Sequence, residues 1–377
     1  MRTLFGAVGA AVALVMTTAG AGAQSSPETP APGSTPKMAP DVYKNIKVLK
    51  DVPADQVIPS MQFIAASLGV DCDYCHDTKA FDKDDLEKKK ADRKKSARKM
   101  ITMTFAINKD SFDGKPKVTC NSCHRGANDP LATPPIPAPE SKSEAEEAAP
   151  AGLPSADQLL DKWVQALGGA DAIQRISSRV EKATVTTPQG RQAAAEVYAK
   201  APDMRLAVMH FKNGDNVAVY NGHAGWSGLP GRPPRALGSV ELDGARLEAD
   251  LYFAAHVKQL FQEFKVGAPQ KIGDRGAYLV VADSPGQPPV LLYLDQQSGL
   301  LVRMVRYADT ALGRFPTQTD YSDYRDCDGV KVAFHWTVET ARPESRFAYH
   351  VDQIQQNVPV DDAKFEKPGA PMVAAQN

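Results

Sequence analysis

Two five-residue segments of the chain combine two cysteines and a histidine at the spacing Cys-x-x-Cys-His. They occupy residues 72–76 and 120–124 and use four of the five cysteines in the 377-residue sequence. In a c-type haem site the two thiols add to the porphyrin vinyl groups, and the histidine that follows coordinates the iron. The repeat therefore predicts two covalently bound haem c groups, each with its own iron. The attachment residues would be Cys72, Cys75, Cys120 and Cys123, and the iron ligands His76 and His124.

Two other chemistries of paired cysteines explain less of the pattern. A structural zinc ion held by both pairs would normally have about a dozen or two residues between them, and Cys75 and Cys120 are much farther apart. Two local disulfides would suit an oxidising compartment. Both alternatives leave the two histidines without a role, so haem is the preferred interpretation.

The start of the chain has the parts of a secretory signal peptide. A basic residue, Arg2, precedes an apolar stretch over residues 4–16, and small residues at 21–23 offer a cleavage site before Gln24. We therefore expect residues 1–23 to be removed and the protein to be periplasmic. It would be tethered to the membrane only if the signal stays uncleaved, since no later stretch is apolar enough to span a bilayer.

Changes in composition divide the rest of the sequence. Residues 24–40 are rich in Pro, Ser, Thr and Ala, which predicts a disordered lead, and residues 129–154 form a linker rich in Pro, Ala and Glu. A haem domain at 41–128 and a haem-free domain at 155–370 follow from these boundaries, with a tail at 371–377. The formal net charge of −1 argues against a nucleic-acid partner.

Helical periodicity places a helix before each haem motif. Apolar residues recur at helical spacing over residues 53–68, which Gly69 ends, and again over residues 82–108. The first helix carries Met61 on its apolar side, and the second carries Met100 and Met103. A methionine thioether can fill the sixth coordination position of haem iron and raise its potential, although methionine is also a common core filler.

These runs resemble the photosynthetic reaction-centre cytochrome c subunit family. The similar segments are residues 61–70, 72–76, 97–103, 107–108 and 118–126. The resemblance implies a di-haem electron-transfer fold in which Met61 ligates the haem of His76. For the haem of His124 it implies Met100, with Met103 one turn on as the alternative, and it suggests that Arg125 contacts a haem propionate. A photosynthetic role follows from the resemblance alone, and a two-haem member fused to another domain could serve any periplasmic electron chain.

The sequence after the linker changes from helical to strand periodicity. Ser155 is a plausible N-cap of a helix that Gly168 ends, and residues 242–264 form a longer helical stretch. Strands joined by turns are predicted at 180–187, 194–200, 205–211, 217–220, 277–282, 290–295, 300–307, 331–338 and 347–354. The element order resembles the lipoprotein-carrier half-barrel folds. The predicted fold class is thus α+β with two domains: a mainly helical di-haem domain and a curved antiparallel half-barrel with packed helices.

The second predicted helix is strongly basic at its start. Residues 88–99 read KKKADRKKSARK, and Asp92 is their only acid. Such a run is commonly a solvated helix face. It could also dock an acidic redox partner, or pair with haem propionates or with the acidic residues 140–147 of the linker.

Three classes of function remain open, and the sequence favours an electron-transfer protein over a substrate-converting enzyme. The leading one is an electron carrier between periplasmic donor and acceptor proteins, with both irons six-coordinate. The second is a di-haem peroxidase-like oxidoreductase, which needs an open iron site. The third is a module that binds an apolar ligand or a partner while its haems report redox state. No catalytic residues are predicted, and Cys327 is expected to be an inert thiol.

Overall fold

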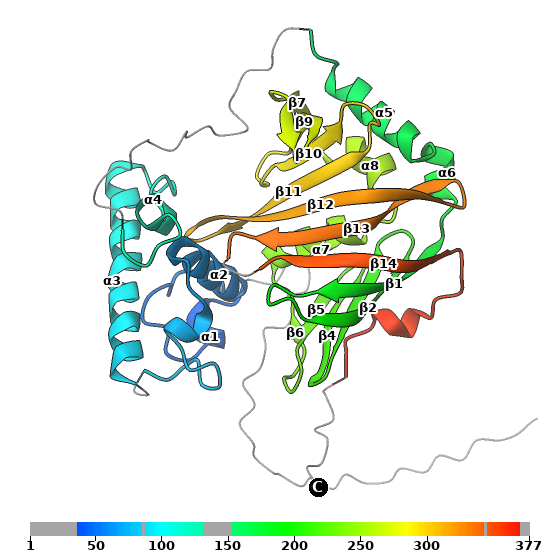
Figure 1. Ribbon diagram of the computed structural model, residues 1–377. Helices are drawn as coiled ribbons and strands as arrows, with labels where there is room; N and C mark the ends of the chain where they lie inside the picture. The colour runs from blue at the N-terminus through cyan, green and yellow to red at the C-terminus, as the bar shows by residue number, and fades with distance from the viewer. Residues whose placement is uncertain (1–35, 85–86, 131–151, 343–344, 370–377) are drawn as a thin grey trace, which may run out of the picture.

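The computed structural model describes residues 36–84, 87–130, 152–342 and 345–369 (Figure 1). The predicted signal peptide and the predicted tail lie outside the described residues, as do most of the predicted lead and linker. The boundaries of 41–128 and 155–370 stay predictions. Among the described residues, no helix combines the length and the apolar character that crossing a bilayer requires.

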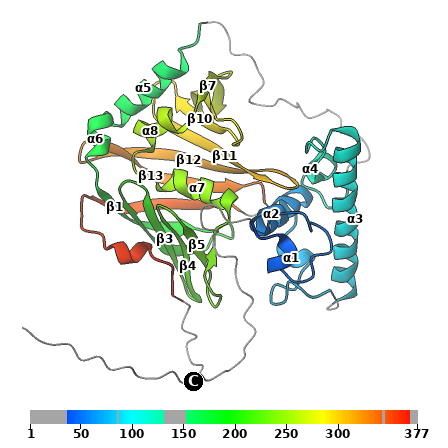
Figure 2. The same ribbon diagram turned by 180° about the vertical axis from the view of Figure 1, so that it is seen from behind.

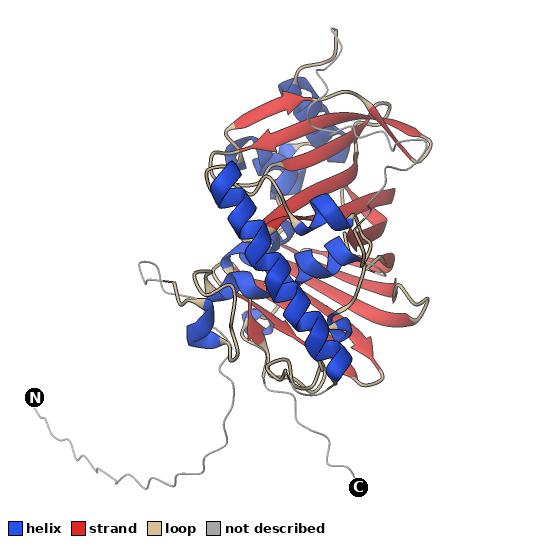
Figure 3. Ribbon diagram, turned by 90° about the vertical axis from the view of Figure 1, so that its left-hand side faces the viewer, coloured by secondary structure: helices blue, strands red, loops and turns tan. Residues whose placement is uncertain are grey.

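The N-terminal region is helical and contains no strand among its described residues. One long helix, α3, runs along its outer side, and the short elements pack between α3 and the rest of the molecule (Figures 1 and 3). The elements are α1 (Ala39–Val42), η1 (Ala54–Gln56), α2 (Val57–Leu68), η2 (Cys72–Tyr74), α3 (Lys88–Ser111) and α4 (Cys120–His124).

The first predicted helix is confirmed, and the second begins later than predicted. Gly69, with a φ of +65°, caps α2 at the expected position. The helix α3 starts at Lys88 and not near residue 82. Before this start, the carbonyls of Phe81 and Lys83 accept hydrogen bonds from the side chain of Lys94.

The C-terminal region is one curved antiparallel sheet with helices packed on it (Figure 2). Its strand order is β6-β5-β4-β3-β2-β1-β14-β13-β12-β11-β10-β9-β7, and β8 also pairs with β9. The helices are α5 (Ala156–Leu167), α6 (Ala170–Gln174), α7 (Ser239–Ala249), α8 (Phe253–Leu260) and η3 (Asp362–Phe365). The strands are β1 (Ser178–Thr186), β2 (Gln192–Lys200), β3 (Met204–Phe211), β4 (Gly214–Asn221), β5 (Gly225–Gly228), β6 (Arg235–Ala236), β7 (Glu263–Val266), β8 (Gln270–Ile272), β9 (Arg275–Asp283), β10 (Val290–Asp295), β11 (Leu301–Thr310), β12 (Gly313–Cys327), β13 (Val330–Thr340) and β14 (Phe347–Gln356).

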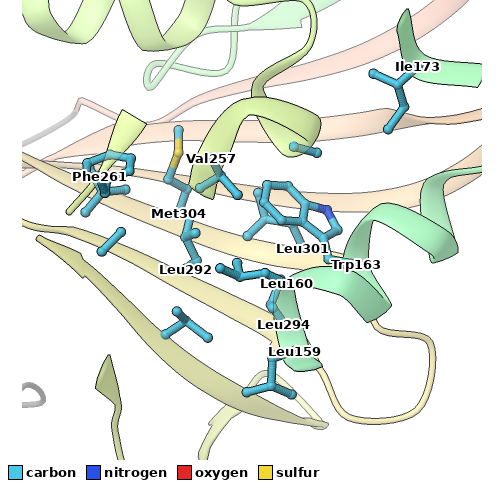
Figure 4. Packing of buried hydrophobic residues seen from close by; sticks show 14 of the residues in the cluster. Leu159, Leu160, Trp163, Ile173, Val257, Phe261, Leu292, Leu294, Leu301 and Met304 are labelled. Carbon is cyan, nitrogen blue, oxygen red and sulfur yellow. The ribbon is translucent and has the colours of Figure 1, made fainter. Parts of the chain in front are cut away.

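The largest core lies between the helices and one face of this sheet. Trp163 and Leu160 of α5 and Val257 of α8 pack on Leu292 and Met304 of neighbouring strands (Figure 4). Ser155 caps α5 as predicted, because its hydroxyl accepts a hydrogen bond from the amide of Gln158. The two-domain α+β class predicted from the sequence is therefore correct.

The predicted helix over 242–264 is wrong in its continuity. The chain forms α7 and α8 with a break at Asp250, whose backbone is extended and whose carboxylate accepts a hydrogen bond from the amide of Tyr252. Phe264 lies in β7. The apolar residues of segment 242–264 still pack in one cluster against the sheet, as expected. The longest strand of the sheet, β12, was not among the predicted strands.

The two regions meet where the hairpin of β11 and β12 reaches α2, an arrangement visible from both sides (Figures 1 and 2). Leu312 and Phe315 of this hairpin are buried together with Phe63 of α2 and Ile101 of α3. The haem-motif region and the sheet therefore share a continuous apolar cluster.

Candidate haem-binding site

Each predicted haem motif forms one helical turn. Residues 72–74 make the short helix η2, and residues 120–124 make α4. Positions i, i+3 and i+4 of a helical turn lie on one side. Both cysteines and the histidine of the second motif therefore share one side of α4, which is the donor set that a c-type haem requires. In the first motif, the amide of His76 donates to the carbonyl of Cys72 (3.0 Å), which closes a turn of the same length. All four cysteines are free thiols.

Both motif histidines are held by a backbone carbonyl. The Nδ1 atom of His76 lies 3.2 Å from the carbonyl oxygen of Phe81, and that of His124 lies 3.0 Å from the carbonyl oxygen of Ala127. A carbonyl only accepts hydrogen bonds, so Nδ1 carries the proton and Nε2 keeps its lone pair. Burial also lowers the pKa of His76 and favours its neutral ring. This tautomer is the one that ligates a metal through Nε2.

Basic side chains of α3 fix the loop that carries the first motif. Lys90 Nζ donates to the carbonyl of His76 (3.2 Å), and Arg93 Nη1 donates to the carbonyl of Tyr74 (2.8 Å). The guanidinium of Arg93 also lies 3.5 Å from the centre of the Tyr74 ring. Lys94, which is 7% exposed, donates to the carbonyl of Phe81, the same oxygen that faces His76 Nδ1. Part of the basic run at residues 88–99 therefore binds the loop of the first haem motif.

The two motifs are joined through the end of α2. The amide of Gly126 donates to the carbonyl of Ser67 (2.9 Å). A Cβ atom on Gly69 would lie 2.1 Å from the carbonyl oxygen of Gly126, so only glycine allows this approach. Met61 and Cys120 contact the same apolar cluster. The structure thus brings the methionine predicted for the first haem close to the second motif.

Most of the large apolar side chains exposed in the described residues belong to this region. Five of the seven lie there: Phe81 (44% exposed), Met100 (41%), Met103 (44%), Phe105 (36%) and Phe112 (38%). A porphyrin has two broad apolar faces, so these side chains fit a haem-covered surface.

An open cavity of about 740 Å³ lies beside α3. Its lining residues are Lys47, Val48, Asp84, Ala91, Lys95, Arg98, Lys99, Thr102 and Met103. The basic side chains at its edge suit the carboxylates of a haem, and hydrogen bonds from Arg98 and Lys47 lower the pKa of Asp84 and keep it ionised. Met103 borders this cavity, whereas Met100 does not line it. Met100 and Met103 are three residues apart, about one helical turn, so both lie on the same side of α3.

Two further sequence expectations concern Arg125 and the zinc alternative. Arg125 is exposed in a left-handed conformation (φ +50°) and forms no ion pair among the described residues, so its propionate contact stays a prediction. Within the described residues, no three or more Cys, His, Asp or Glu side chains gather in an arrangement that could hold a metal ion.

The sequence missed several residues that shape this site. The contacts of Lys90, Arg93 and Lys94 follow from their spacing of three or four residues, which puts them on one side of the helix and could have been noticed. Leu312 and Phe315 had no such signal, because their partners lie some 200 or more residues away in the chain.

A helical region with two Cys-x-x-Cys-His motifs is thus attached to an antiparallel sheet. The family described as photosynthetic reaction centre cytochrome C subunit matches residues 9–158, which confirms the predicted resemblance for this part of the chain.

Two curated relatives carry the same description. The subunit of Roseobacter denitrificans is 36% identical over 107 residues, covering 25% of this chain and 27% of the relative. That of Thermochromatium tepidum is 33% identical over 101 residues, covering 26% and 24%. The chain thus spans about a quarter of the length of the curated relatives it matches.

Several solved structures resemble a larger part of the chain. A DUF1329 family protein from Desulfovibrio piger covers 56% of this chain and 96% of its own length, at 14% identity and a TM-score of 0.40. A LolA superfamily protein from Nitrosomonas europaea covers 57% and 99%, also at 14% identity and a TM-score of 0.40. These are neighbours of the kind that the predicted element order suggested, and at these scores they carry no argument about function.

Proposed function

We propose that the protein is a periplasmic di-haem c-type cytochrome that transfers single electrons between protein partners. Its domains would be 41–128 for the haems and 155–370 for the sheet, joined by the linker 129–154. The observation that carries the proposal is the pair of Cys-x-x-Cys-His turns, each with its histidine Nδ1 bonded to a backbone carbonyl. The similarity of residues 9–158 to reaction-centre cytochromes supports it.

The residues divide into attachment, ligation and positioning. Cys72, Cys75, Cys120 and Cys123 would form the thioether bonds, and His76 and His124 would ligate the irons. A bound haem supplies a one-electron iron couple. The carbonyls of Phe81 and Ala127 orient the imidazoles, and the exposed apolar side chains of this region would contact a bound haem.

The second axial ligands are proposed to be methionines. Met61 lies on α2 before the first motif, and its neighbours include the apolar cluster shared with Cys120. Met100 is the proposed ligand of the second haem from the family resemblance, with Met103 as the alternative. Both are exposed on α3, so either thioether is accessible to a haem. Two Met-ligated irons have no open position, which suits electron transfer and not peroxide chemistry.

The outer side of α3 is proposed to dock an acidic redox partner. Lys88, Lys89, Lys95 and Lys99 are exposed, and none of them forms an ion pair within the part of the chain that the structure describes. Clustered positive charge accelerates encounter with an acidic surface, and salt weakens this effect. The reduction rate with an acidic partner should therefore fall as ionic strength rises.

The deciding experiment is haem analysis of the full-length protein made with a c-haem maturation system. We expect two covalent, low-spin haems and an iron–thioether absorption band. Met61→Leu should weaken this band, and so should one of Met100→Leu and Met103→Leu, while the other serves as the matched control. Leucine preserves apolar volume but cannot ligate.

The opposite outcomes are equally clear. A high-spin haem that binds carbon monoxide or peroxide would overturn the electron-carrier proposal and favour the peroxidase-like alternative. A protein without covalent haem would refute the haem assignment. Lipid that co-purifies with a protein whose redox kinetics do not depend on the sheet domain would favour the binding-module alternative.

A further inference from the structure

The hairpin of β11 and β12 carries an apolar tip into the helical region. Leu312 is 2% exposed and Phe315 is 5% exposed, although both lie at the end of a hairpin, where side chains are normally solvated. Their buried neighbours are Phe63 of α2 and Ile101 of α3. The hairpin tip is therefore part of the core beneath the haem motifs.

This apolar cluster reaches residues of both proposed haem sites. Met61, the proposed ligand of the first iron, packs against it, and so does Cys120, a proposed attachment residue of the second haem. A side chain of the sheet domain can thus influence both haems from a single position.

The turn is shaped to fit against α2. Gly313 has a φ of +147°, and a Cβ atom there would lie 2.4 Å from the ring of Phe63. Thr310 Oγ1 donates to the carbonyl of Gly313 (2.6 Å) and accepts from the amide of Leu312 (3.2 Å). These bonds fix the tip in the conformation that presents Leu312.

Polar contacts hold the same two regions together around the cluster. Ser239 Oγ donates to Asp55 (2.6 Å), just before α2. Arg342 pairs with Asp71 (3.0 Å), directly before the first motif, and Arg232 donates to the carbonyl of Thr78 (3.1 Å), just after it. The sheet domain thus holds both ends of the first haem motif.

We propose that the β11–β12 hairpin is a component of the haem environment, in which Leu312 and Phe315 are positioning residues that hold Met61 and Cys120 and exclude water between the two haems. This inference rests on the proposed function. The oxidised haem carries one more positive charge than the reduced haem, so apolar surroundings disfavour it and raise the reduction potential. The sheet domain is then an integral part of the electron carrier.

The test uses the full chain with Leu312→Asn, which keeps the side-chain size but admits water. The expected result is two bound haems and about a tenfold shift toward the oxidised form at a fixed potential, which is about 59 mV for a one-electron couple. The iron–thioether band of Met61 should weaken as well. Leu312→Met, which keeps the site apolar, should have the reduction potentials and the iron–thioether band of the wild type. Leu260→Asn, at a position that is 38% exposed on α8, should change neither.

Wild-type potentials and an unchanged band in Leu312→Asn with two haems would overturn the proposal. If this variant does not fold, Phe315→Leu decides in its place, since it removes volume from the same cluster without adding a polar group. A smaller shift in the same direction supports the proposal, and no shift overturns it. Failure of the proposed function is recognised separately, because the wild-type protein would then lack two low-spin haems.

Discussion

Lys94 is the buried cation whose removal tests the site most directly. Its side chain is almost fully buried, and Nζ donates to the carbonyls of Phe81 (3.2 Å) and Lys83, with Asp84 3.7 Å away. We consider Lys94→Met, which retains the apolar stem and removes the charge. Hydrogen bonds to charged groups contribute about 1.5–3 kcal/mol each. The loss of this pair should lower the free energy of unfolding by about 2–4 kcal/mol, since methionine recovers part of the packing.

The same substitution should change one haem and not the other. The ammonium of Lys94 polarises the Phe81 carbonyl that accepts from His76 Nδ1, which weakens that acceptor. Without Lys94 the carbonyl accepts more strongly, the imidazole becomes a better donor to iron, and the oxidised state is favoured. The potential of the His76 haem should fall. The Ala127 carbonyl that faces His124 has no such cation bonded to it among the described residues, so the reduction potential of the His124 haem should not change.

Denaturant unfolding and a spectroelectrochemical titration measure the two effects. Lys89→Met is the matched control, because Lys89 is exposed on the same helix and does not line the cavity. Its stability should stay within about 0.5 kcal/mol of wild type. Equal stability of the two variants together with unchanged potentials would refute the reasoning.

Three further outcomes follow from the packing and the charges. Gly69→Ala should destabilise by about 1–3 kcal/mol more than Gly114→Ala in thermal unfolding, since both have positive φ but only the first meets a backbone oxygen, that of Gly126; equal losses would contradict this. Hydrogen bonds, chiefly from Arg98, lower the pKa of Asp84 in the folded state. The ionised carboxylate therefore stabilises the fold above about pH 4, and this stabilisation is lost as the pH falls further. In Asp84→Asn, the melting temperature should depend less on pH below about pH 4 than in the wild type. Trp163→Ala should cost about 3–5 kcal/mol in denaturant unfolding, and Trp163→Phe much less.

Local chemistry determined which elements the sequence could predict. Ser155 and Gly69 are specific signals for the start and the end of a helix, and both work as expected. The Cys-x-x-Cys-His turns are equally local, since each forms within five residues. Elements of this kind depend on neighbours in the sequence, so one chain is enough to find them.

The features that escaped prediction depend on distant residues. β12 contains Pro316, Asp320 and Asp323, types that are unfavourable in strands. It forms because β11 and β13 pair with it on both sides. The burial of Leu312 likewise requires Phe63, far away in the chain. No periodicity within a segment records such pairings, so the contact between the two regions appears only in the structure.

The basic helix α3 combines two roles that an experiment can separate. Lys90 and Lys94 lie one turn apart on its inner side and bond carbonyls of the first haem motif, so their charges are fixed close to one haem. Lys88 and Lys89 are exposed, where salt screens their charge. Neutralising Lys94 should therefore change the reduction potential of the His76 haem without changing how the rate of reduction by an acidic partner depends on salt. Neutralising Lys88 and Lys89, which are exposed and do not line the cavity beside α3, should reduce that salt dependence and leave both reduction potentials unchanged. If the inner and outer substitutions changed the same quantity, the division of this helix into a positioning side and a docking side would be wrong.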